Sequence, residues 1–190
     1  LIRKKTSSMT NPSLHPLQVF TAAYDFAKSA HGHQRRKYTG LPYIHHPQAV
    51  ASIVQGVVRP DQWDAVVAAY LHDVVEDTSV SFGNIEDKFG PEVTNLVFWM
   101  TDVSRAKHGN RALRKRLDRM HIASAPALAQ TIKLADLIDN TESIVEYDRN
   151  FAKVYLREKA ALLDVMRLGD PGLYIRCQDL LRKHRELWDV

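Results

Sequence analysis

The sequence lacks what a disulfide-stabilised, membrane-spanning or disordered protein would need. Its 190 residues include one cysteine, Cys177, which excludes an intramolecular disulfide and a zinc cluster of thiolates and suits a reducing compartment such as the cytoplasm. The longest unbroken apolar run, Ala65 to Leu71, is too short to cross a bilayer. Hydrophobic residues still make up 45% of the chain and charged residues 25%, so the composition is that of a folded globular domain.

The excess of positive charge is small and lies mainly at one end. Lys and Arg outnumber Asp and Glu by 26 to 22, but three of these cations lie in residues 1–8, which hold no acid, so over residues 9–190 the count is 23 to 22. We therefore expect no membrane partner and no general binding of nucleic acid. We expect residues 1–8 to be a disordered tail or fusion remnant and residues 9–190 to form a single domain.

Apolar periodicity predicts helices along nearly the whole chain. From Val19 to Ala30, apolar residues recur at spacings of three and four, as on one face of an amphipathic helix. Segment 61–77 is apolar nearly all round and predicts a buried central helix. No segment alternates as a strand would, so we expect an all-α fold, an irregular multi-helix bundle. Helices are expected over 14–31, 47–58, 61–77, 81–89, 92–103, part of 105–119, 125–140, 151–168 and 171–188.

Four ionisable residues interrupt the apolar segment 61–77, in the run His72-Asp-Val-Val-Glu-Asp77. Because a charge in a low dielectric needs a partner, a bound cation would explain them. On a helix, His72 and Asp73 project about 100° apart and can reach one ion, while Glu76 lies on their side one turn later and could hold a water molecule. The alternative, favoured for a histidine–aspartate pair alone, is the polar end of a core helix.

Two further clusters offer metal ligands. Asp136 lies in an apolar helical segment, with Lys133 one turn before it and Asn140 one turn after it on the same side. His46 precedes Pro47, which suits the first turn of a helix. Taken singly, each could be an ordinary surface or capping residue. Together the clusters offer two imidazoles and two carboxylates, a set typical of manganese, iron, cobalt or zinc rather than calcium: His46, His72, Asp73 and Asp136.

These motifs resemble those of the HD-domain metal-dependent phosphohydrolases, and specifically the RelA/SpoT-type hydrolase domain. The resemblance covers residues 14–181. It implies an all-α fold, a single divalent ion, namely manganese, and removal of the 3′-pyrophosphate from (p)ppGpp to give GDP or GTP. Since a synthetase domain would not fit beside it, we expect a stand-alone small alarmone hydrolase. The matching stretches are 34–37, 40–47, 72–78 and 133–136 with Asn140.

The resemblance also implies roles for individual residues. The metal ligands would be His46, His72, Asp73 and Asp136. His46 is chosen over His45 because it precedes the proline. The family's catalytic acidic pair is intact, so we expect active hydrolysis, with a water molecule oriented or deprotonated by Glu76 and Asp77. Contacts to the nucleotide substrate would come from Arg36, Lys37, Lys133, Asn140 and Tyr155.

Other interpretations of the sequence stay open. A phosphatase acting on NADPH or an adenine alarmone would use the same metal site. A catalytically silent module that binds nucleotide or RNA would not need the intact acidic pair. Segment 105–119 holds seven Lys or Arg residues against one acid; it could be a mobile cover that attracts a polyanion, but a solvated helix face is favoured. No oligomeric state is predicted.

Overall fold

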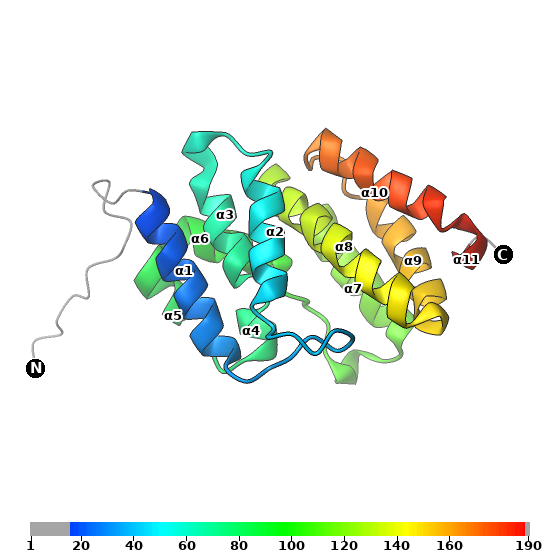
Figure 1. Cartoon of the computed structure of the whole chain (residues 1–190), viewed down its shortest axis with the longest axis horizontal. Coiled ribbons are helices and arrows are strands. Elements are labelled where there is room, and N and C mark those ends of the chain that lie inside the picture. Colours follow the sequence, from blue (N-terminus) through cyan, green and yellow to red (C-terminus); the bar gives the residue numbers. More distant parts are fainter. Residues whose placement is uncertain (1–15, 189–190) are drawn as a thin grey trace, which may run out of the picture. The chain divides into compact units, whose positions relative to one another are not determined.

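The computed structural model describes residues 16–188, and the expected all-α fold is confirmed there (Figure 1). Over these residues the regular structure is α-helix and short 3₁₀ turns, with a single isolated β-bridge. No helix in the described part of the chain combines the length and apolar character that a bilayer crossing requires. The tail expected at residues 1–8 lies outside the described residues.

The chain divides into two compact units, and the first comprises the described parts of residues 1–34 and 43–101. Helix α3 is its centre and packs against α1, α2 and α6. Five consecutive small residues, Ala65 to Ala69, are buried in α3 and allow the neighbouring helices to approach closely. The elements are α1 (Pro16–His31), α2 (His45–Gln55), the 3₁₀ turn η1 (Pro60–Gln62), α3 (Trp63–Leu71), α4 (Val74–Asp77), α5 (Phe82–Phe89) and α6 (Pro91–Met100).

The single helix expected over 61–77 is wrong, because α3 ends at Leu71 and α4 begins at Val74. Nδ1 of His72 lies 2.8 Å from the carbonyl oxygen of Ala69. In a continuous helix that carbonyl accepts the amide of residue 73, so the imidazole competes with the helical hydrogen bond. The break therefore falls at the two residues that the sequence marks as metal ligands.

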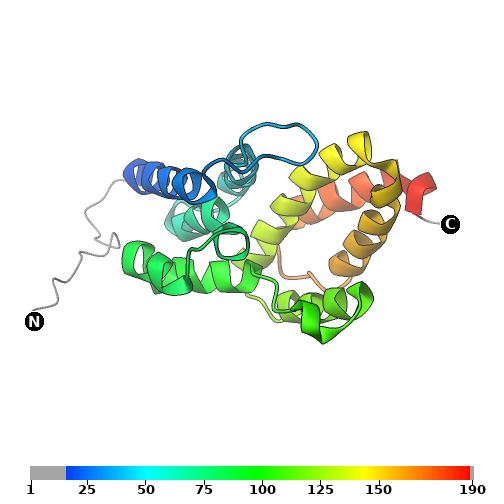
Figure 2. The same cartoon turned by 90° about the horizontal axis from the view of Figure 1, so that it is seen from below.

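The second unit comprises residues 35–42 and the described part of 102–190. Its longest helix, α8, packs against α7, α9 and α10, and Figure 2 shows α8 and α10 side by side from below. Gly169 lies close against α8, because a Cβ there would lie 2.7 Å from Cδ1 of Leu134 and that side chain would have to move. The helical elements are the 3₁₀ turn η2 (Ala106–His108), α7 (Arg111–Ala123), α8 (Ala127–Tyr147), α9 (Arg149–Leu163), α10 (Pro171–Lys183) and α11 (Arg185–Trp188).

Residues 35–42 form a tight loop in this second unit. A bridge between Arg35 and Pro42 closes it, and the amide of Arg36 donates to the carbonyl of Leu41 at 2.9 Å. Gly40 turns the chain at φ +69°, a conformation that a residue with a Cβ rarely adopts. The loop therefore presents Arg36 and Lys37 from a defined backbone.

Candidate metal centre and nucleotide site

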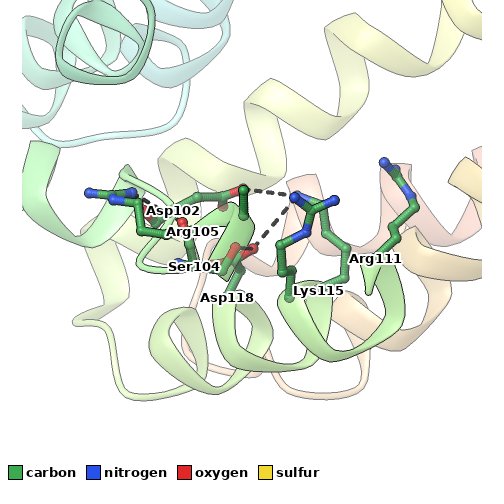
Figure 3. Close-up of a pocket in the computed structure, with 8 residues that line it drawn as sticks. Asp102, Ser104, Arg105, Arg111, Lys115 and Asp118 are labelled. Carbon is green, nitrogen blue, oxygen red and sulfur yellow. Dashed lines mark hydrogen bonds and ion pairs between the residues drawn. The ribbon is translucent and has the colours of Figure 1, made fainter. Parts of the chain in front are cut away.

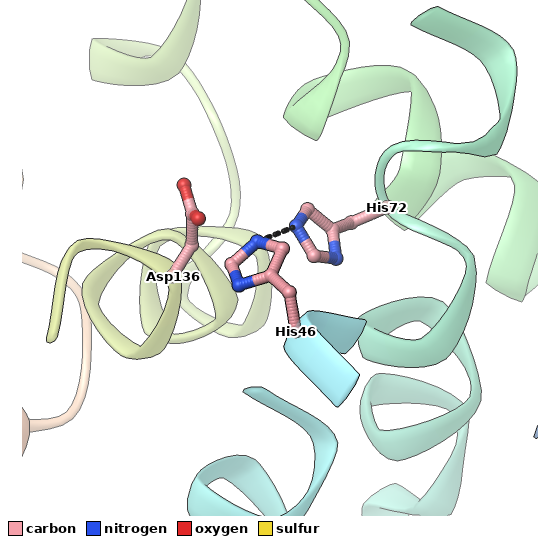
Figure 4. Close-up of side chains that lie close together, drawn as sticks. All are labelled: His46, His72 and Asp136. Atoms are coloured by element: carbon pink, nitrogen blue, oxygen red, sulfur yellow. Dashed lines mark hydrogen bonds between the residues drawn. The ribbon is translucent and has the colours of Figure 1, made fainter. Parts of the chain in front are cut away.

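Two buried histidines and an aspartate meet in the first unit. His46 comes from the first turn of α2, whereas His72 and Asp73 form the break between α3 and α4. Nε2 of His46 lies 3.2 Å from Nε2 of His72, and Figure 4 marks the contact between the two rings with a dashed line. Oδ2 of Asp73 lies 3.1 Å from Nε2 of His72 and 3.5 Å from Nε2 of His46. Three atoms of the kind that bind metals therefore lie within 3.5 Å of one another.

The spacing and protonation of these atoms suit a divalent ion. Two imidazole nitrogens bound to one ion at about 2.1 Å stand about 3.0–3.4 Å apart at octahedral or tetrahedral angles. The carbonyl oxygen of Ala69 can only accept a hydrogen bond, so the Nδ1 of His72 that faces it carries the proton. The lone pair of His72 is then on Nε2, the nitrogen that faces His46 and Asp73. By contrast, the neighbouring His45 is exposed.

Tyr43 holds the carboxylate of this cluster. Its hydroxyl donates to Oδ2 of Asp73 at 2.6 Å, and its ring stands edge-on to the ring of His46. A hydrogen bond to a ligating carboxylate fixes the direction of its lone pairs. Sequence reasoning gave Tyr43 no role, although the residue lies in the matching stretch 40–47, three residues before His46.

The acidic pair lies one turn beyond this cluster, on α4. Glu76 and Asp77 are both exposed, in contrast to the buried histidines. Oδ2 of Asp77 accepts a hydrogen bond from Nε2 of Gln34 at 2.9 Å. The pair can therefore reach solvent water while one of its members is held by a neighbouring side chain.

The remaining predicted ligand, Asp136, lies in the second unit on α8 (Figure 4). It is buried, and both of its carboxylate oxygens are engaged. Nζ of Lys133 lies 2.9 Å from Oδ2, and Nδ2 of Asn140 donates to Oδ1 at 2.6 Å. The structure therefore brings together the three α8 residues whose spacing in the sequence placed them on one side of a helix.

Arg36 joins this cluster from the loop of the same unit. Its guanidinium donates to Oδ1 of Asn140 at 2.9 Å and to Oδ2 of Asp139 at 3.2 Å. It also lies 3.4 Å from the hydroxyl of Ser143. Held by three side chains of α8, Arg36 is a cation of fixed position rather than a mobile surface group.

The other two predicted substrate contacts differ in their surroundings. Lys37 is exposed, and hydrogen bonding to the hydroxyl of Tyr38, followed by that to Asp148, raises its pKa. The hydroxyl of Tyr155 donates to the carbonyl of Leu137 at 3.4 Å, and burial raises the pKa of that hydroxyl. Lys37 therefore stays a cation near neutral pH. A contact of Tyr155 with the nucleotide stays a prediction.

Comparison with known proteins connects these clusters to a family. A family model described as an HD domain matches residues 23–161. The chain belongs to the HD domain family. The match includes every predicted site residue from Arg36 to Tyr155, so the resemblance found in the sequence motifs is confirmed.

Relatives of this HD domain are named for alarmone hydrolysis. Over 131 residues the chain is 37% identical to guanosine-3′,5′-bis(diphosphate) 3′-pyrophosphohydrolase MESH1 of Drosophila melanogaster, covering 68% of this chain and 72% of that protein. Over 122 residues it is 33% identical to guanosine-3′,5′-bis(diphosphate) 3′-pyrophosphohydrolase of Aquifex aeolicus, covering 64% of this chain but only 17% of that protein. A solved structure, described as a metazoan ortholog of SpoT that hydrolyzes ppGpp, aligns with a TM-score of 0.79 and 31% identity. That alignment covers 92% of this chain and 99% of the other.

The basic segment 105–119 of this HD domain overlaps helix α7. Together with Asp102 and Ser104 it lines a pocket of about 240 Å³ in the second unit (Figure 3). The predicted surface helix is confirmed. Nζ of Lys115 lies 2.9 Å from Oδ2 of Asp102, and Asp118 accepts from both the amide and the hydroxyl of Ser104 at 2.9 Å. Burial opposes ionisation of Asp102, but the charges of Lys133 and Lys115 outweigh it and lower the pKa. Acids therefore balance part of the basic charge, and a mobile cover that attracts a polyanion stays the less favoured alternative to a solvated helix face.

Proposed function

We propose that this HD domain removes the 3′-pyrophosphate of guanosine alarmones, converting ppGpp to GDP and pppGpp to GTP with release of pyrophosphate. Water adds to the phosphorus nearer the ribose, the bond from that phosphorus to O3′ breaks, and O3′ takes a proton. The observation that carries the proposal is the meeting of His46, His72 and Asp73 within 3.5 Å, in a chain whose relatives bear the name of this activity.

We propose that the ligands of one divalent ion are His46, His72, Asp73 and Asp136. The mixed nitrogen and oxygen donors support manganese, although iron, cobalt and zinc share this preference. When bound, such an ion supplies charge that binds phosphate oxygens and lowers the pKa of a water molecule. The buried position of Asp136 and its bonds to Lys133 and Asn140 support a carboxylate of fixed orientation.

The residues around the ligands then have distinct tasks. Glu76 and Asp77, exposed on α4, orient the attacking water and accept its proton. Cations near the diphosphate offset the negative charge that grows in the transition state. The proposed phosphate and nucleotide contacts are Arg36, Lys37, Lys133, Asn140 and Tyr155.

We place this activity in the cytoplasm, with a small nucleotide as the partner.

Cys177 is buried as a free thiol, and burial raises its pKa to about 11. A thiol in that state is a poor nucleophile, so Cys177 fills space in the core and takes no part in the chemistry.

The test is phosphate analysis after incubation of the full chain with ppGpp. Pyrophosphate and orthophosphate are measured with the ion present, after chelation, and after manganese is restored, with NADPH and an adenine alarmone in parallel. We expect pyrophosphate from ppGpp, lost on chelation and recovered with manganese. Orthophosphate alone would indicate a phosphatase, and nucleotide binding without turnover would indicate a binding module; either result overturns the proposal.

A further inference from the structure

Two hydrogen-bonded side chains, His31 and Gln34, connect the end of α1 to Asp77 of the acidic pair, entirely within the first unit. We call this hydrogen-bonded chain the relay. Nδ1 of His31 lies 2.8 Å from Oε1 of Gln34, and Nε2 of Gln34 donates to Oδ2 of Asp77 at 2.9 Å. His31 is the last residue of α1, and Gly32 turns the chain at φ +51°. This turn brings Gln34 back between the imidazole and the carboxylate.

The chemistry of the groups fixes the direction of this relay. An ionised Asp77 can only accept, so the amide nitrogen of Gln34 must face it and the amide oxygen must face His31. Nδ1 of His31 must then carry the proton and donate to that oxygen. Each member of the relay thereby selects one orientation of the next.

The other ring nitrogen of His31 indicates why the position holds a histidine. His31 is buried, and its Nε2 has no hydrogen-bond partner among residues 16–188. A buried polar atom without a partner costs free energy that an apolar side chain of similar size would avoid. The cost of the unpaired Nε2 is explained if the imidazole is present for the hydrogen bond that its Nδ1 donates to Gln34.

The same imidazole ring contacts the support of the metal ligand. Its centroid lies 4.5 Å from the ring of Tyr43, whose hydroxyl donates to Asp73. The amide of Tyr43 also donates to the backbone carbonyl of Gln34 at 3.0 Å. The residues that hold Asp73 and Asp77, at the two ends of the short helix α4, are thus packed and bonded to each other.

We propose that Gln34 and His31 are positioning residues for the hydrolysis, holding the carboxylate of Asp77 toward the attacking water. The inference rests on the proposed function. Asp77 is exposed and lies at the end of a four-residue helix, so without the relay its side chain would sample several rotamers. The relay lowers the number of orientations that the Asp77 carboxylate samples before the substrate binds.

The test compares four variants by steady-state kinetics with ppGpp. Gln34→Met removes the relay at nearly constant size, His31→Phe removes the Nδ1 donor, and His31→Asn keeps a donor close to the position of Nδ1. Gln55→Met, at the exposed end of α2, is the matched control. Thermal unfolding of each variant verifies that it is folded.

We expect Gln34→Met and His31→Phe to lower kcat about 10–100-fold, the usual effect of losing a partner that orients a reacting group. KM and the manganese concentration for half-maximal activity should stay within about twofold of the wild type, because neither ligand nor substrate contact is removed. His31→Asn should recover most of the loss, and Gln55→Met should behave as the wild type. An unchanged kcat in Gln34→Met, or equal losses in the two His31 variants, would overturn the positioning role.

A second measurement does not depend on turnover. In ¹⁵N NMR spectra of the wild-type chain, we expect Nδ1 of His31 to be protonated and Nε2 to be unprotonated. A proton on Nε2 alone would overturn the relay. A chain with the expected tautomer but no hydrolysis of ppGpp would overturn the proposed function and the positioning role with it. Hydrolysis that is insensitive to Gln34→Met would overturn the positioning role alone.

Discussion

The hydroxyl of Tyr43 lies 2.6 Å from Oδ2 of Asp73, the same oxygen that faces the Nε2 atoms of both buried histidines. The tyrosine therefore restrains the direction of the carboxylate. With Asp73 as a proposed ligand, this arrangement predicts that Tyr43 affects metal affinity from outside the proposed ligand set.

Substituting Tyr43 with phenylalanine should weaken metal binding. Loss of the hydrogen bond frees the Asp73 carboxylate to rotate, and we expect about 10–100-fold more manganese to be needed for half-maximal activity. Manganese titration of the apo chain by calorimetry provides the check, with Tyr24→Phe on α1 as control. An unchanged affinity would show that Asp73 needs no external support.

Replacing the two adjacent histidines should give opposite results. His46→Ala removes a buried, proposed ligand and should lower metal-dependent activity more than about 100-fold, beyond the usual cost of an outer partner. His45→Ala alters an exposed side chain and should leave metal content and kcat at wild-type values. Metal analysis of the two purified variants together with their turnover decides the assignment, and comparable losses in both would contradict it.

Neutralising Glu76 should separate metal binding from chemistry. Glu76→Gln keeps the size of the side chain but removes its basicity, so kcat should fall about 10²–10⁴-fold, the range for a positioned acid or base. Metal content should be unchanged, because Glu76 is not among the proposed ligands. Glu86→Gln on the exposed face of α5 serves as control, and full turnover in Glu76→Gln would exclude this role.

Buried Lys159 on α9 should make the free energy of unfolding rise with pH above about pH 8. Its Nζ donates to the hydroxyl of Thr141 at 2.8 Å, and burial lowers its pKa from 10.5 to about 8. Between these values the unfolded chain binds a proton that the folded chain has lost, so the free energy of unfolding rises with pH, by about 3 kcal/mol over the full interval. Below pH 8 both states are protonated and this gain is absent.

Lys159→Met should abolish that rise. Urea unfolding from pH 7 to pH 10 gives the free energy of unfolding of the wild type and of the variant. Their difference at each pH isolates Lys159, because the other titrating groups are common to both chains. Exposed Lys153→Met on the same helix should leave the pH dependence as it is. Parallel curves for the wild type and Lys159→Met would show that Lys159 keeps an ordinary pKa when folded.

The sequence predicted those features that depend on spacing along one helix. The side shared by Lys133, Asp136 and Asn140 follows from helical geometry alone, and the hydrogen bonds of Asp136 agree with it. The contact of Arg36 with Asn140 joins residues 104 positions apart, which no local periodicity can indicate. The motifs that resemble the HD family supplied the remaining assignments.

The errors have equally specific causes. Apolar periodicity continues through His72, so it predicts one helix where a side chain competing for the carbonyl of Ala69 produces two. The supporting roles of Tyr43 and Gln34 depend on contacts across the first unit, formed only when α1 and the start of α2 meet α4. Side-chain hydrogen bonds of this kind leave no periodic signal in a sequence.

The bond from His72 to the carbonyl of Ala69 also determines how protons and metal ions compete for that ring. Because Nδ1 is committed to the backbone as a donor, the competition is confined to Nε2. If His72 binds the proposed ion, uptake requires no tautomer exchange, because folding sets the tautomer of the ring before any ion arrives. A mutation that restored a continuous helix through residues 69–73 would remove this preparation and make ion capture slower, even with every ligand still in the chain.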